Sequence, residues 1–66
     1  MRENIFTVIL TKPEGMSIEM AVKREGLTPE QAYEYVVSKQ RRRVREAIED
    51  GEYIVSIIPD VNNVPV

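Results

Sequence analysis

A helix-start signal at residues 26–31 constrains the fold of this chain more than any other feature. Thr28 is a good N-cap residue, and Pro29 stands at the first helical position, where proline is favoured. Gln31 lies three residues after Thr28, so the two side chains can form a capping box. We therefore predict one long helix from Pro29 to about Asp50, where the next residue is a glycine.

Residues on both sides of this helix have the composition and period of β-strands. Residues 4–11 are rich in β-branched and aromatic side chains, and residues 52–59 repeat that pattern. In both segments, apolar residues alternate between the two faces of the predicted strand. One face carries Phe6, Val8, Leu10, Tyr53, Val55 and Ile57, and the other carries Ile5, Ile9, Ile54 and Ile58.

Residues 16–23 fit two structures. Apolar and polar residues alternate there with a period of two, and a Pro-x-Gly turn at residues 13–15 precedes them, so we favour the second strand of a hairpin. The alternative is a short helix capped by Ser17. The spacing of apolar and small residues over 18–32 then resembles the helix-turn-helix motif, with Gly26 in the turn. Val22 and Ala32 depart from that motif, which usually has a small and a branched residue there.

The predicted fold is therefore α+β with the order β-β-α-β, in which a small three-stranded sheet packs on one long helix. The strands are predicted at residues 4–11, 16–23 and 52–59. At 66 residues we expect the chain to be one small domain, with residues 60–66 as either a frayed end or an extended C-terminal arm that reaches a neighbour. The alternative fold is a helix-turn-helix with flanking strands.

The composition argues against an enzyme. Histidine and cysteine are both absent, which removes the usual general base, the thiol nucleophile and the commonest metal ligands. No hydroxyl or carboxylate lies in a recognisable catalytic motif, so we expect no cofactor and no metal. The longest apolar runs are far shorter than the ~20 residues that span a membrane. The first 20 residues do not resemble a secretion signal, and we expect a cytoplasmic protein.

Two features point to partners. The isoleucines on the second face need cover that one helix cannot give, and a core this small supplies only about 3–5 kcal/mol. We therefore expect a homodimer, in which the chain acts as a small protein-interaction or regulatory module. The second feature is a basic run on the predicted helix of a chain whose net charge is −2. It makes nucleic acid the alternative partner, and its predicted contact residues are Lys39, Arg41, Arg42 and Arg45.

Overall fold

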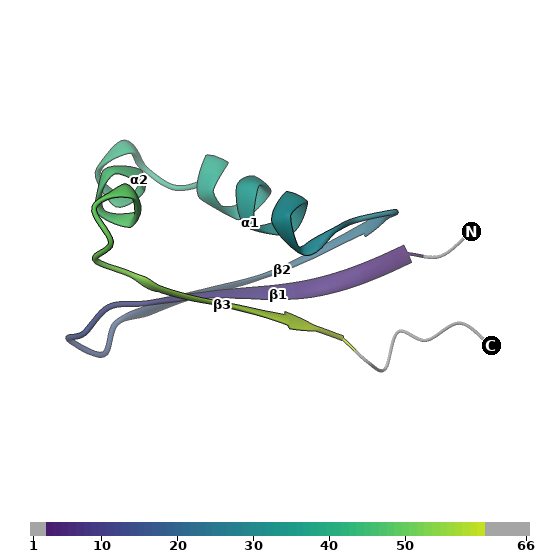
Figure 1. The fold of residues 1–66 in the computed structure, drawn as a ribbon, viewed down its shortest axis with the longest axis horizontal. Helices are drawn as coiled ribbons and strands as arrows, with labels where there is room; N and C mark the ends of the chain where they lie inside the picture. The colour runs from purple at the N-terminus through teal and green to yellow at the C-terminus, as the bar shows by residue number, and fades with distance from the viewer. Residues whose placement is uncertain (1–2, 61–66) are drawn as a thin grey trace.

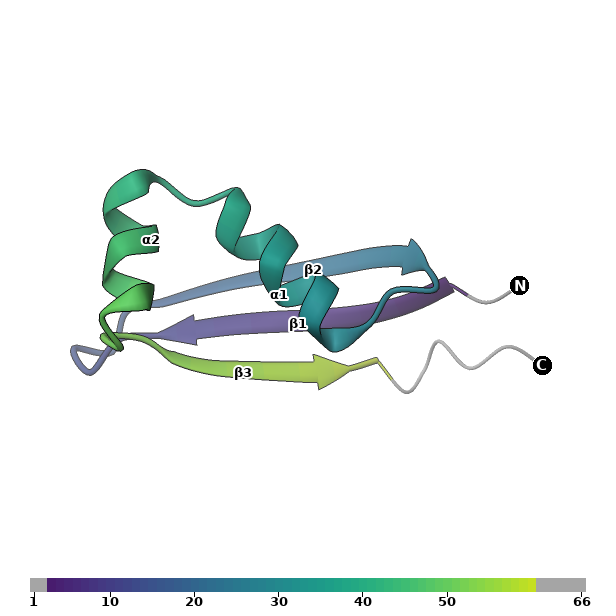
Figure 2. The same cartoon turned by 45° about the horizontal axis from the view of Figure 1, so that its top comes forward.

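The computed structural model describes residues 3–60 and confirms the α+β class. Its elements are β1 (Glu3–Thr11), β2 (Ser17–Glu25), α1 (Pro29–Ser38), α2 (Arg42–Glu49) and β3 (Ile54–Pro59). The strands form one sheet in the order β2-β1-β3, and β1 pairs antiparallel with both neighbours. Both helices cover the same face of the sheet, as Figures 1 and 2 show. The predicted arm lies outside the described residues, apart from Asp60.

The hairpin between β1 and β2 confirms the strand interpretation of residues 16–23. Lys12 and Met16 close the loop, since the Lys12 amide donates to the Met16 carbonyl at 2.8 Å. The Gly15 amide donates to the Lys12 carbonyl at 2.9 Å, and Gly15 has a φ of 92°. A type I turn followed by a residue with positive φ is the usual three-residue hairpin loop, and glycine adopts that φ without strain. The helix-turn-helix alternative is wrong, because residues 17–25 form a strand.

The start of α1 is the feature that the sequence predicted best. The Gln31 amide donates to the Thr28 hydroxyl at 3.1 Å, and the Thr28 amide donates to the Gln31 side-chain oxygen at 3.1 Å. Both halves of the predicted capping box are therefore present. A third bond, from Asn4 Nδ2 to the Leu27 carbonyl at 3.0 Å, ties the loop before α1 to the first strand.

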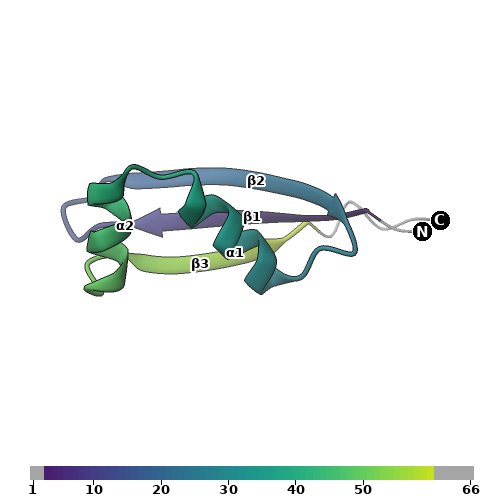
Figure 3. The same ribbon diagram turned by 90° about the horizontal axis from the view of Figure 1, so that it is seen from above.

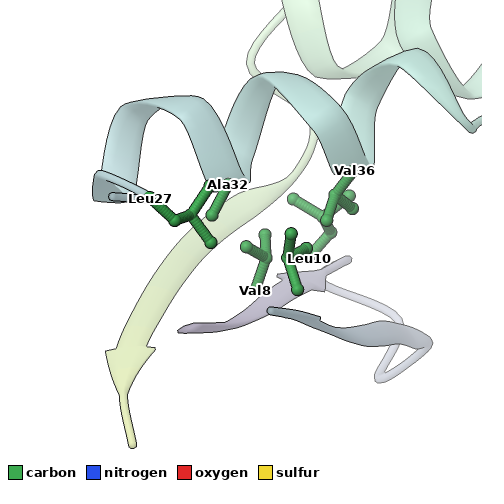
Figure 4. Packing of buried hydrophobic residues seen from close by; sticks show 6 residues of the cluster. Val8, Leu10, Leu27, Ala32 and Val36 are labelled. Atoms are coloured by element: carbon green, nitrogen blue, oxygen red, sulfur yellow. The ribbon is translucent and has the colours of Figure 1, made fainter. Parts of the chain in front are cut away.

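The core lies between α1 and the sheet. Figure 4 shows Leu27, Ala32 and Val36 above the sheet, with Val8 and Leu10 of β1 below them. Four of these five residues are 0% exposed, Leu27 is 2% exposed, and Val22 of β2, which belongs to the same cluster, is 7% exposed. Ala32 has the smallest side chain of the set and is completely buried. This cluster explains why the face of β1 with alternating Val8 and Leu10 turns towards the helices.

The prediction of one long helix is wrong, because the helical segment is divided at residues 39–41 into a ten-residue and an eight-residue helix. A continuous helix over residues 29–50 would be roughly 33 Å long. A straight helix of this length could not follow the path of the chain. In Figure 3, α1 crosses the sheet diagonally towards β2, and α2 turns back across the hairpin end towards β3. Since β1 lies between β2 and β3, the connection must return over the sheet before the last strand begins.

Two polar side chains mark the break. Gln40 Nε2 donates to the Val36 carbonyl at 2.9 Å, which is the bond that the Gln40 amide would make in a continuing helix. The amide itself donates to the Val37 carbonyl at 3.0 Å. The Ser38 hydroxyl donates to the Tyr35 carbonyl at 2.6 Å. Side chains that bond helix carbonyls compete with continuation of the helix, so these residues end α1 without proline or glycine.

Candidate interaction surfaces

The face of the sheet opposite the helices has no cover from the described part of the chain (Figure 1). We call it the open face. The pairing register places on it, along β1, residues 5, 7, 9 and 11, and along β3, residues 54, 56 and 58. Its apolar members are the predicted isoleucines and one alanine of β2, namely Ile5, Ile9, Ala21, Ile54 and Ile58.

Among the isoleucines of the open face, those of β3 are the most exposed. Ile54 is 65% exposed and Ile58 is 50% exposed, whereas Ile5 and Ile9 in the central strand are half-buried by their neighbours. On β2 the same face carries charges, and Lys23 pairs with Glu3 at 3.5 Å. The apolar part of the open face therefore runs from the central strand to the β3 side of the sheet.

The predicted basic residues all lie at the corner between the two helices and are all exposed. The break separates them into two groups. Lys39 follows α1, and its Nζ lies 5.1 Å from the centre of the Tyr35 ring. Arg41 is the N-cap of α2, and Arg45 lies one turn later on the same helix. Arg42 forms an ion pair with Glu46 at 3.4 Å, in which both side chains are largely exposed.

A hollow of about 340 Å³ lies beside α2, and Arg43, which is not among the predicted contact residues, lines it. Arg43 and Lys12 line it together with the carboxylates of Glu46, Asp50 and Glu52. Tyr53 also lines it, and Lys12 Nζ lies 5.4 Å from the centre of the Tyr53 ring. The mixture of charges gives the hollow no strong preference for an anion or a cation. Only the hairpin brings Lys12 to α2, so nothing local in the sequence indicated this group.

Within residues 3–60, no group of three or more acidic side chains lies close enough together to hold a metal ion. Neither helix in that part of the chain has the length and apolar character needed to cross a bilayer. Comparison of the chain with models of protein families, with curated proteins and with solved structures found no significant match.

Proposed function

We propose that this protein is a small non-enzymatic interaction module that acts as a homo-oligomer, with a regulatory rather than a chemical role. The observation that carries the proposal is the open face, where isoleucines of β1 and β3 remain accessible while the helices cover the other side. Exposed apolar patches of this kind mark association sites in small proteins. The absence of histidine and cysteine supports a role that requires no catalytic base or thiol.

The small size of the core supports association as well. Among residues 3–60, six make up the buried cluster, and α2 contributes none of them. A domain of this length buries only about 60% of the surface of its unfolded chain, so it gains comparatively little from folding alone. Covering Ile54 and Ile58 against a second copy adds apolar burial without a larger chain.

Sedimentation equilibrium at increasing protein concentration tests this proposal. We expect the wild-type protein to form dimers at tens of micromolar and the Ile58→Lys variant to remain monomeric at that concentration. The matched control is Met16→Lys, which places the same charge on a 69% exposed residue of the hairpin loop and should leave association unchanged. A wild-type protein that stays monomeric throughout would contradict the proposal.

The second candidate is a nucleic-acid-binding regulator that uses Lys39, Arg41, Arg42 and Arg45. It is favoured by the exposure of these residues and by the absence of acidic residues from the first turn of α2. Several acidic residues follow this basic run directly and would repel a phosphate backbone that ran past it. Protein interaction is therefore our leading proposal.

A gel-shift experiment with duplex and single-stranded probes separates the two candidates. If the arginines contact phosphates, the logarithm of the affinity falls linearly with the logarithm of salt concentration, with a slope set by the number of contacts. Replacing Arg41 and Arg42 by glutamine would then weaken binding to all sequences alike. The control is the pair Lys23→Gln and Arg24→Gln, which removes the same charge from β2. Tight binding at low salt that only the arginine variant loses would contradict the leading proposal.

A further inference from the structure

The two edges of the sheet differ sharply in charge. The β2 edge carries Glu19, Lys23, Arg24 and Glu25, and charged edge residues are a common protection against pairing with another strand. The β3 edge, with the sequence Ile-Val-Ser-Ile-Ile-Pro, carries no charge at all. A charged strand that paired with β3 would have no opposite charge to contact on this edge. An uncharged strand could pair with β3 without leaving charges unpaired.

The pairing of β3 with β1 determines which residues of β3 direct their backbone amides towards β1 and which direct them outward. The Asp60 amide donates to the Ile5 carbonyl at 2.9 Å, in the same register that pairs Phe6 with Pro59. In an antiparallel pair, hydrogen-bonded and non-hydrogen-bonded positions alternate. The even-numbered residues of β3 therefore point their amides towards β1. Val55 and Ile57 point their amide and carbonyl groups towards the opposite edge, where no strand of the described residues pairs with them.

The outward backbone groups and the side-chain pattern of β3 both allow this strand to pair with a second copy of itself. Around Ser56 the sequence of β3 reads Ile-Val on one side and Ile-Ile on the other. An antiparallel copy with Ser56 opposite Ser56 places Val55 opposite Ile57, and both residues have outward amides to exchange. The same register sets Ile54 beside Ile58 on the open face. A shift by one pair in one direction would oppose Val55 to Pro59, which has no amide to donate. A shift in the other direction would oppose Ile57 to Tyr53, which precedes the first residue of β3.

We infer that the β3 edge binds the β3 edge of a second copy of this chain, antiparallel and centred on Ser56. This inference rests on the proposed homo-oligomer and specifies its geometry. The product is a continuous six-stranded sheet with a twofold axis through its middle, and both helix layers lie on the same side. The two open faces join into one surface, on which Ile54 of each copy packs beside Ile58 of the other.

A proline substitution tests the edge without touching the open face. Val55→Pro removes an outward amide, and proline is tolerated at an edge strand when its missing amide faces solvent. We expect the monomer fold to persist and the dimer dissociation constant to rise at least tenfold. The control Val55→Thr keeps the amide and the β-branched side chain, and should dimerise like the wild type. Undiminished dimerisation of a folded Val55→Pro variant would overturn edge pairing and leave the homo-oligomer itself standing.

Disulfide cross-linking provides a second test that does not depend on the proline variant folding. The chain has no cysteine, so Ser56→Cys introduces one thiol per copy. Opposed residues at a non-hydrogen-bonded position have Cα atoms about 4.5 Å apart, within disulfide range. Ser17→Cys lies on the same face but at the other edge, more than about 24 Å from its counterpart, because five strand spacings separate them. With diamide as oxidant, we expect a covalent dimer from Ser56→Cys alone. Equal cross-linking of both variants, or none from Ser56→Cys, would overturn the inference.

Discussion

At the scale of single residues, neighbours in β1 have opposite roles because successive side chains of a strand point to opposite faces. Leu10 is fully buried under α1, while Ile9 lies on the open face and is half-buried. Both residues are apolar, and their environments differ only because the helices cover one side. The sequence predicted this division correctly, since Phe6, Val8 and Leu10 form the more regular of the two apolar alternations.

The consequence for stability can be measured with two alanine variants. Leu10→Ala should lower the free energy of unfolding by about 2–5 kcal/mol, the usual range for truncation of a buried leucine. Because a core this small supplies only about 3–5 kcal/mol, this variant should retain little of the stability of the wild type. Ile9→Ala should cost clearly less when the protein is dilute. Urea unfolding followed by circular dichroism measures both, and equal losses would contradict the assignment of the two faces.

At the scale of the elements, the start of α1 was predictable and the break after it was not. Thr28, Pro29 and Gln31 form a local signal that needs no information about the sheet. The break depends on topology, because the chain must cross β1 to reach its edge position at β3. Gln40 was the one local sign, as a polar residue in an otherwise apolar stripe, and its side chain bonds the Val36 carbonyl.

Removing the cap of α1 tests how much this local signal contributes. Thr28→Ala deletes the hydroxyl that accepts from the Gln31 amide, and should lower the free energy of unfolding by about 1 kcal/mol. Thr28→Ser keeps a hydroxyl at the same place and should stay close to the wild type. Thermal unfolding of the three proteins compares them directly. A Thr28→Ala variant as stable as the wild type would show that tertiary packing alone fixes the start of α1.

At the scale of the whole molecule, the sequence predicted the three strands, their order along the chain, and which isoleucines lack cover. It did not predict the two edges of the sheet, because the pairing of β3 with β1 rather than β2 depends on contacts far apart in the chain. The basic residues lie at a corner rather than along one helix, for the same reason. The strand order identifies β2 and β3 as the edge strands. Only with this order known can the charged edge at β2 be compared with the uncharged edge at β3.

Amide hydrogen exchange, followed by NMR as the protein concentration is raised, tests the central claim most directly. The amides of Ser56 and Ile58 point towards β1, so they should be protected at every concentration and serve as internal controls. The amides of Val55 and Ile57 should exchange freely in dilute protein and become protected as dimers form. If they exchange freely at all concentrations, while the other two remain protected, the copies do not pair through β3.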